Sequence, residues 1–201
     1  MGPTFSIRLA EEADTPLILR FIRELAEYEH LLHEVVADED TLRTWIFQKG
    51  GAQVLIAQEG PEPVGFALYF HNFSTFLGKC GLYLEDLYVR PEHRGKGYGL
   101  ALLKRLAAIA VSEGCGRLEW WCLDWNQPSI DFYRALPAQP MEDWTVYRVA
   151  GQPPTDLAQG GGAAPTSPNK ASAGLEFSSP AFFCLTYLVF RGILYLEIRG
   201  I

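Results

Sequence analysis

The sequence predicts an α/β (α+β) protein in which helices pack against a mixed β-sheet. Its apolar patterns follow the order strand, helix, helix, three strands, helix, strand, helix, strand, which is typical of such a sheet. The length of 201 residues favours one domain with appendages, because domains cluster near ~100–150 residues. Hydrophobic residues make up 48% of the chain and charged residues 20%, a mixture that can bury a sizeable core.

The first strand and the first two helices are expected near the N-terminus. Residues 5–9 alternate apolar and polar side chains, which suits a strand with one buried face. Asp14 is a plausible N-cap for a helix whose apolar positions recur at helical spacing over residues 17–28. A weaker helical pattern covers residues 38–47, and a pair of glycines ends that region.

Three β-rich runs follow, at residues 53–58, 64–70 and 81–89. Residues 60–63 (GPEP) join the first two, so we expect an antiparallel pair with a proline-containing turn. Pro91 closes the third run, because proline cannot donate a hydrogen bond into a ladder.

The second half of the pattern predicts a helix over residues 99–113 and a strand over residues 118–123. A short helix is expected over residues 128–135. The alternating segment WTVYRV at residues 144–149 predicts a final strand.

Composition divides the chain into three segments. We expect a single domain over residues 1–151, a Gly/Pro/Ser-rich disordered linker over 152–180, and an apolar tail over 181–201. The tail either packs on the domain or a partner, or is an extension unrelated to the domain. Its longest uncharged run, residues 181–190, is too short for a bilayer, which needs roughly 20 residues, so no membrane partner is expected.

Charge and cysteine usage indicate partners and compartment. The formal net charge of -7 argues against a nucleic-acid partner and is compatible with a cationic substrate. The N-terminus lacks a signal-peptide pattern, and the scattered cysteines suggest reduced thiols, so we expect a cytoplasmic protein. Neither cysteines nor histidines show metal-ligand spacing, and no metal cofactor is expected. Trp120, Trp121 and Trp125 are expected to pack in a core or dimer contact.

The strongest local signal is a glycine-rich loop, Arg94-Gly95-Lys96-Gly97-Tyr98-Gly99, between a strand and a helix. A helix N-terminus offers unpaired N–H groups to an anionic phosphate, and glycines let the backbone wrap closely around a ligand. The Rossmann fingerprint and the P-loop do not fit, because their glycines and lysine are spaced differently. A glycine-rich turn without a ligand is the remaining alternative.

With these surroundings the sequence resembles the GNAT acetyltransferase superfamily over roughly residues 5–150. The acetyl-CoA motif of that family, R/Q-x-x-G-x-G/A, is matched by Arg94, Gly97 and Gly99. The resemblance implies a largely antiparallel central sheet with a V-shaped splay between two parallel strands and helices on both faces.

Two segments resemble the diamine (spermidine/spermine) and thialysine acetyltransferase branch: YLEDLYV at residues 83–89 and DWNQPSIDFY at residues 124–133. This resemblance implies acetyl-CoA as the acetyl donor, a small cationic amine as the acceptor, and a homodimer. The implied cofactor-binding residues are Leu87, Tyr88, Val89, Arg94, Gly95, Lys96, Gly97, Tyr98, Gly99, Asn126, Ser129 and Tyr133. The backbone of Leu87 and Val89 would pair with pantetheine. The amides of the glycine-rich loop would hold the pyrophosphate, and Asn126 would contact the pantetheine arm.

Acetyl transfer needs a neutral amine, yet an alkyl ammonium has a pKa near ~10.4, so a base must accept a proton. Glu85 and Asp86 are neighbours on one expected strand, where adjacent side chains point to opposite faces unless a bulge turns one of them. The resemblance implies that Glu85 removes the proton through water and that Asp86 holds the substrate ammonium. The alternative is an exposed or salt-bridged acidic pair.

The resemblance also makes Tyr133 the general acid for the CoA sulfur, where an isolated tyrosine would more often pack in a core. It places Glu29, Glu142 and Trp144 against the amine, since carboxylates and an indole face attract cations. Glu29 alone would fit a solvated helix end equally well. Two departures from the branch are Ser74, where an acidic residue is expected, and Pro137, where glycine is usual; Ser74 disfavours long polyamines.

The leading hypothesis is therefore an acetyl-CoA-dependent N-acetyltransferase that acts directly on a diamine, polyamine or lysine-like amine. Cys122 lacks an evident paired histidine, so an acyl-enzyme is not expected. The alternatives are a non-catalytic acyl-CoA-binding module and a protein-lysine acetyltransferase.

Overall fold

The computed structural model describes residues 4–151 and 153–160, which fall into two units that divide between Trp125 and Asn126. Its elements are β1 (Phe5–Leu9), η1 (Glu12–Asp14), α1 (Thr15–Tyr28), η2 (Leu32–Glu34), α2 (Glu39–Leu42), η3 (Arg43–Gln48), β2 (Gln53–Glu59), β3 (Glu62–Ser74), β4 (Lys79–Val89), η4 (Pro91–His93), α3 (Tyr98–Ser112), β5 (Leu118–Trp120), α4 (Gln127–Arg134) and α5 (Pro153–Ala158). The first unit holds the elements from β1 to β5, and the second holds α4 and α5.

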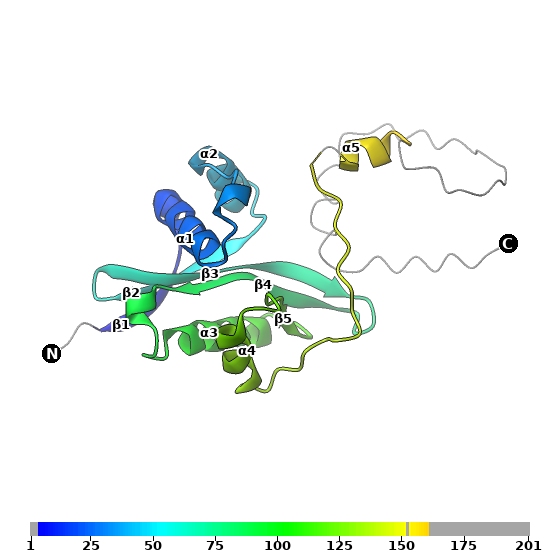
Figure 1. The fold of residues 1–201 in the computed structure, drawn as a ribbon. Helices are drawn as coiled ribbons and strands as arrows, with labels where there is room; N and C mark the ends of the chain where they lie inside the picture. Colours follow the sequence, from blue (N-terminus) through cyan, green and yellow to red (C-terminus); the bar gives the residue numbers. More distant parts are fainter. Residues whose placement is uncertain (1–3, 152, 161–201) are drawn as a thin grey trace. The chain divides into compact units, whose positions relative to one another are not determined.

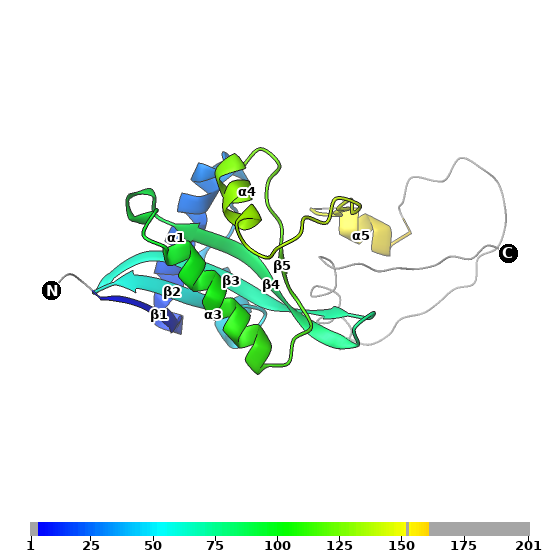
Figure 2. The same ribbon diagram turned by 90° about the horizontal axis from the view of Figure 1, so that it is seen from below.

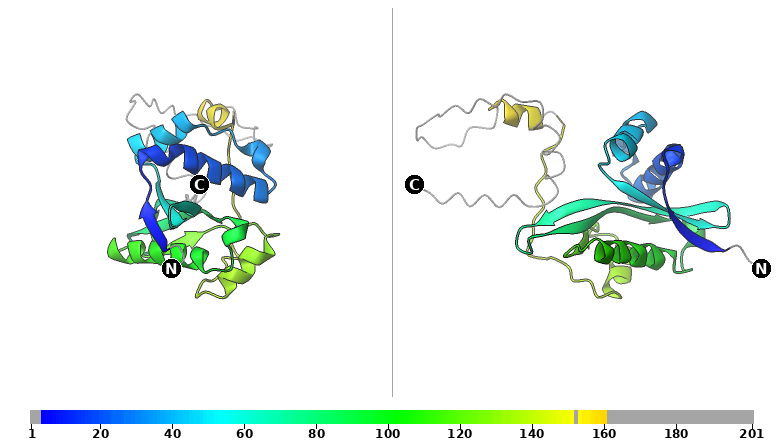
Figure 3. Two further views of the ribbon diagram at one scale, coloured as in Figure 1. Left: turned by 90° about the vertical axis from the view of Figure 1, so that its left-hand side faces the viewer. Right: turned by 180° about the vertical axis from the view of Figure 1, so that it is seen from behind.

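A five-stranded sheet in the order β1-β2-β3-β4-β5 forms the centre of the first unit. Neighbouring strands are antiparallel except β4 and β5, which are parallel. Helices α1 and α2 cover one face of the sheet and α3 covers the other, as Figures 1, 2 and 3 show from different sides. The predicted mixed sheet with helices on both faces is confirmed.

The core lies on both faces of this sheet. On the α1 face, Phe21 stacks on Phe66 with ring centres 5.4 Å apart, and Ile18 is fully buried beside them. On the α3 face, Leu102 and Leu106 of the helix are fully buried. These apolar positions recur at helical spacing in the sequence, so the amphipathic pattern alone determines which helix face is buried.

The predicted strand over residues 144–149 is wrong, because no secondary structure forms there. Every residue from 141 to 150 is exposed, so the alternating side chains have no buried face and the backbone joins no ladder among the described residues. Helix α5 was not expected within the predicted linker, and residue 152, the linker from residue 161 onward and the tail lie outside the described residues. Among the residues that the structure describes, no helix is long and apolar enough to cross a membrane.

The close approach of β3 to β4 depends on Gly65. A Cβ atom there would clash with the carbonyl oxygen of Tyr88 and lie 3.1 Å from Val89 Cα, both backbone atoms that cannot rotate away. We expect Gly65→Ala to lower the free energy of unfolding by about 1–3 kcal/mol, measured by urea denaturation.

Gly116→Ala is the matched control for this substitution. Its new Cβ would meet Leu77 Cδ1 at 2.8 Å, the end of a side chain that can move. Equal losses of stability in the two variants would contradict the proposed backbone clash.

Candidate active site

The parallel strands β4 and β5 separate in the middle of β4. Their pairing ends where Leu84 meets Trp120, whereas β4 continues to Val89. From Asp86 onward β4 therefore pairs with β3 on one side, whereas no described strand pairs with its other side beyond Leu84. This is the splay that the resemblance implied.

The open edge presents the backbone of two predicted cofactor residues, Leu87 and Val89. The N–H of Arg90 donates to Val64 O across to the β3 side, at 2.9 Å. Backbone groups alternate between the two edges of a regular strand, so the N–H and C=O groups of Leu87 and Val89 point away from β3. Val89 O accepts a hydrogen bond from Arg94 Nε at 2.8 Å, in agreement with this direction.

A bulge interrupts β4 at the predicted acidic pair. Leu68 of β3 lies opposite Asp86, but the next residue, Tyr69, lies opposite Leu84, so Glu85 is the extra residue of β4. A bulge of this kind re-aims side chains that would otherwise alternate.

The bulge brings both carboxylates to one face of the sheet. Asp86 shares the face of Leu68, which belongs to the core beneath α1. Leu84 shares the face of Tyr69, whose phenol interacts with charges on α3. Glu85 follows Leu84 by one residue, so alternation also turns Glu85 toward the α1 face. The sequence alone did not show whether Glu85 and Asp86 share a face, and the strand register indicates that they do.

The glycine-rich loop enters α3 through two left-handed backbone positions. Gly95 has φ 75° and Gly97 has φ 85°, a region that side chains with a Cβ rarely adopt. Gly97 is also the N-cap of α3, so the first N–H groups of a 15-residue helix follow it directly. Such groups lack intrahelical partners and suit an anion.

Charged side chains around the loop are already engaged. Lys96 Nζ lies 2.9 Å from Glu59 Oε2, and His93 Nδ1 lies 2.9 Å from the same oxygen. The hydrogen bonds from Lys96, then from His93, lower the pKa of Glu59. The guanidinium carbon of Arg94 lies 4.7 Å from the Tyr28 ring centre. A phosphate at this loop would therefore be held first by the backbone amides, and Lys96 or Arg94 would add to its binding only by leaving part of these contacts.

The end of α1 meets the segment that follows β5. The rings of Tyr28 and Trp125 lie 6.3 Å apart, and Glu29 is the C-cap residue of α1. Burial raises the pKa of Glu29. Burial first, and then the charge of Glu29, raise the pKa of the Cys122 thiol. Glu29 is thus half-buried and close enough to Cys122 to affect its thiol, and does not lie on a solvated helix end.

Trp125 lies beside Tyr28 and His30 and is 52% exposed, so it does not pack in the core of the described chain. The other expectation, a dimer contact, stays a prediction. The position of Trp125 directly before the Asn-x-Pro-Ser segment is the only signal that pointed to the site.

The second unit carries the remaining predicted residues. Asn126 caps α4, and its Oδ1 accepts a hydrogen bond from the N–H of Ser129 at 3.3 Å. Tyr133 is four residues after Ser129 and so shares its helix face. Glu142 and Trp144 lie in the exposed segment after this helix. Helix α4 and its cap therefore hold the residues predicted to contact pantetheine and to act as the general acid. The two residues predicted to bind the amine lie outside this helix.

Comparison with known proteins places this geometry in a family. Residues 19–136, more than half of the chain, match the Acetyltransferase (GNAT) family. The chain belongs to this family. It is an acetyltransferase of the GNAT type, and the family's acetyl donor is acetyl-CoA.

This GNAT chain is similar to the thialysine N-epsilon-acetyltransferase of Bos taurus, with 42% identity over 164 residues, 76% of this chain and 96% of that protein. It is 31% identical over 191 residues to an L-ornithine N5-acetyltransferase of Arabidopsis thaliana, which covers 72% of this chain and 84% of that protein. Among solved structures, an integron cassette protein of V. cholerae matches with a TM-score of 0.66 and 29% identity, over 77% of this chain and 98% of that one.

One departure of this GNAT chain from the diamine branch has a structural explanation. Ser74 is buried at the end of β3, where its Oγ accepts a hydrogen bond from the N–H of Leu77 at 3.3 Å. The hydroxyl thus supports the turn between β3 and β4. This fits a packing role at the position where an acidic residue was expected.

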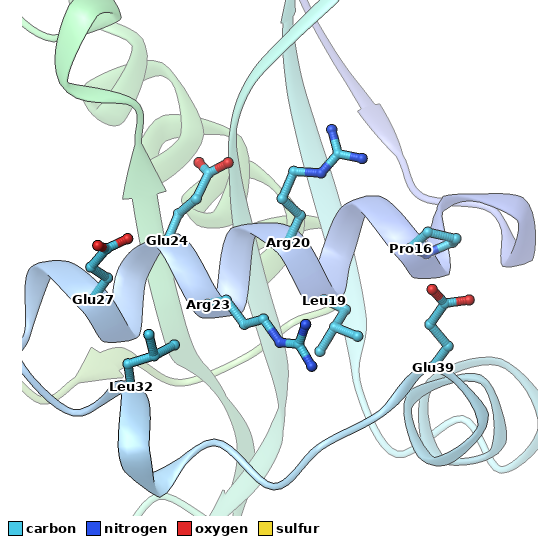
Figure 4. Close-up of a pocket in the computed structure, with 8 residues that line it drawn as sticks. All are labelled: Pro16, Leu19, Arg20, Arg23, Glu24, Glu27, Leu32 and Glu39. Carbon is cyan, nitrogen blue, oxygen red and sulfur yellow. The ribbon is translucent and has the colours of Figure 1, made fainter.

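A pocket of ≈ 370 Å³ lies beside α1 of this GNAT domain. Figure 4 shows side chains of α1, with Leu32 and Glu39 of the following segments, around it. Glu24 at its border is tied to Arg90 by two hydrogen bonds of 3.0 Å and 2.8 Å. None of the predicted site residues lines this pocket.

The raised pKa of Glu29 makes the stability of this GNAT domain depend on pH. A folded-state pKa above the unfolded value contributes stability at acidic pH, and this contribution is lost as the pH rises through the folded pKa. We therefore expect Glu29→Gln to have a higher Tm than the parent protein at neutral pH, and the same Tm in acid below the ordinary value of 4.5. Thermal unfolding across acid and neutral pH measures this difference.

The exposed neighbour Glu27 provides the control, because Glu27→Gln should shift Tm little at any pH. A Glu29→Gln protein that is less stable than its parent at neutral pH would show that the carboxylate is stabilised by its surroundings.

Proposed function

We propose that this chain transfers the acetyl group of acetyl-CoA directly to a primary amine of a small cationic molecule. The strongest support is that strand β4 combines two features. It has an open edge that can pair with pantetheine, and a bulge that turns two carboxylates to one face. A protein that only bound acyl-CoA would need the open edge but not the paired carboxylates.

The residues present fit acetyl-CoA. The edge groups of Leu87 and Val89 can pair with the amides of the pantetheine arm, and the N–H groups after Gly97 can hold the pyrophosphate. Asn126, which caps α4, is proposed to contact the same arm. When bound, acetyl-CoA supplies an activated thioester as the acetyl donor.

In the proposed mechanism one residue accepts a proton and another donates one. Glu85 accepts the ammonium proton through water, so that the neutral amine can attack the acetyl carbon. A backbone N–H stabilises the oxyanion that develops, and Tyr133 donates its phenolic proton to the departing thiolate. The C–N bond forms first, and the C–S bond breaks as the oxyanion collapses. The attacking nitrogen then gives its surplus proton to the Tyr133 phenolate, and Glu85 releases the first proton to solvent, so that both residues return to their starting states.

We propose a lysine-like or ornithine-like amine as the acceptor. The similar proteins named above act on thialysine and L-ornithine, both short amines with a second charged group. Asp86, Glu29, Glu142 and Trp144 are proposed to hold the cationic chain. Ser74, buried in a turn, offers no charge for the far end of a long polyamine.

We further propose that residues 1–151 form the catalytic domain and that the protein acts as a cytoplasmic homodimer. The homodimer follows from the resemblance to the diamine branch. Light scattering at micromolar concentration tests it, and a monomer mass would contradict it.

A thiol-release assay with acetyl-CoA and a panel of amines tests the proposed function. The panel contains thialysine, ornithine, lysine, putrescine, spermidine, spermine and a histone-tail peptide. We expect the highest kcat/KM with thialysine or ornithine and lower values with spermine. Turnover of the peptide alone would favour a protein-lysine acetyltransferase. If no amine of the panel is acetylated although calorimetry shows that acetyl-CoA binds, a non-catalytic binding module would be favoured.

A further inference from the structure

Three side chains that commonly bind metals meet at the C-terminal end of α3. They are His71 of β3, Glu113 at the helix C-cap, and Cys115 two residues later. One ligand atom of each lies within 4.8 Å of the others, and His71 Nε2 is 2.6 Å from Glu113 Oε2. The 15 residues of α3, at 1.5 Å each, place this cluster about 22 Å from the glycine-rich loop. None of the three has a role in the proposed reaction.

The backbone holds two of these residues in a fixed turn. Gly114, with φ 71°, ends the helix in the left-handed conformation. The N–H of Cys115 bonds to Ala110 O at 2.8 Å and that of Gly114 to Val111 O at 3.2 Å, the two bonds of a Schellman motif. This motif places Glu113 and Cys115 on either side of one glycine.

A further hydrogen bond ties the turn to the sheet. The N–H of Gly116 donates to Cys80 O on β4 at 2.7 Å. The turn is therefore fixed against β4, the neighbour of the strand that carries His71. The three ligand positions are set by the backbone and do not depend on long mobile side chains alone.

The donor set selects the class of metal. Imidazole nitrogen, thiolate sulfur and carboxylate oxygen are the three ligand types of protein zinc sites. Mg²⁺ and Ca²⁺ prefer oxygen ligands alone. The last carbonyls of α3 add partial negative charge beside the cluster, which favours a cation. Glu113 is 43% exposed at its side chain, so a fourth ligand can come from water.

We propose that His71, Glu113 and Cys115 bind one zinc ion, which fastens the C-terminal end of α3 to β3. On binding, the proton on Nε2 of His71 leaves that nitrogen and the neutral ring keeps its single proton on Nδ1, so the hydrogen bond to Glu113 is replaced by two metal bonds. The Cys115 thiol releases its proton to solvent, since the thiolate is the ligand. The ion takes no part in acetyl transfer and strengthens the attachment of a core helix.

Cobalt substitution of the full chain tests this proposal, with any affinity tag removed and the thiols reduced. We expect one Co²⁺ per chain, with a thiolate-to-cobalt charge-transfer band and the intense visible bands of tetrahedral Co²⁺. Zn²⁺ should displace it at the same stoichiometry. Cys115→Ser should abolish the charge-transfer band. His71→Gln and Glu113→Gln should each weaken Zn²⁺ binding by roughly 10-fold or more, since removing even a supporting group of a site costs this much.

Matched controls are Cys122→Ser and His33→Gln, which change the same residue types outside the cluster. Both should keep the band and the affinity. Acetyl-CoA binding by calorimetry, unchanged in every variant, verifies the fold and separates this result from the fate of the proposed function. Absence of the charge-transfer band in the parent protein, or equal Zn²⁺ affinity in ligand and control variants, would overturn the proposal.

Discussion

Replacing Tyr133 with phenylalanine is expected to lower kcat by roughly 10²–10⁴-fold, the usual contribution of a positioned proton donor. The substitution removes only the phenolic oxygen, so the ring that lies 5.2 Å from Phe132 can stay in place. The departing thiolate would then leave without a proton. Acetyl-CoA affinity should remain, because Asn126 and the glycine-rich loop are unchanged. Steady-state kinetics and calorimetry measure the two effects separately.

Tyr147→Phe is the control for this experiment, since Tyr147 belongs to the same unit and is 88% exposed. It should keep the parent kcat. Full activity in the Tyr133 variant would remove this residue from the mechanism and leave water as the proton donor.

Replacing Glu85 with glutamine is expected to produce a loss of similar size in kcat, roughly 10²–10⁴-fold at neutral pH. The amide cannot accept the ammonium proton, so only the small fraction of neutral amine can react. That fraction grows as the pH approaches the amine pKa near ~10.4, and the loss should therefore shrink at high pH. A pH profile of kcat/KM for both proteins measures this.

Asp86→Asn gives the informative comparison, because both carboxylates lie on the same face of one strand. It should raise KM for the cationic amine more than it lowers kcat, since Asp86 is proposed to bind and not to accept a proton. The assignment of the two roles would be reversed if Asp86→Asn reduced kcat strongly and Glu85→Gln affected only KM.

Much of the fold could be predicted because its signals are local. An alternating run predicted β1, and β-rich runs predicted β2 to β4. Helical spacing predicted α1 and α3 to within about one residue at most ends. The glycine-rich loop was found because left-handed backbone at Gly95 and Gly97 requires glycine at fixed positions.

The remaining features depend on pairing between distant segments. The pattern at residues 144–149 suits a strand, but no neighbour pairs with it in the described part of the chain. The bulge at Glu85 follows from the register with β3, which no single strand encodes. The cluster of His71, Glu113 and Cys115 escaped the search for ligand spacing because β3 supplies one member and the end of α3 the other two.

The separation of β4 from β5 also bears on how the protein behaves without its ligand. An uncovered strand edge is a template on which another chain can add a strand, and natural proteins usually cover or charge such edges. In the proposed function the edge from Glu85 to Val89 receives a ligand arm, so a cover of the ordinary kind would block the site. Occupancy by acetyl-CoA would thus protect the sheet from unwanted self-association as well as present the acetyl group.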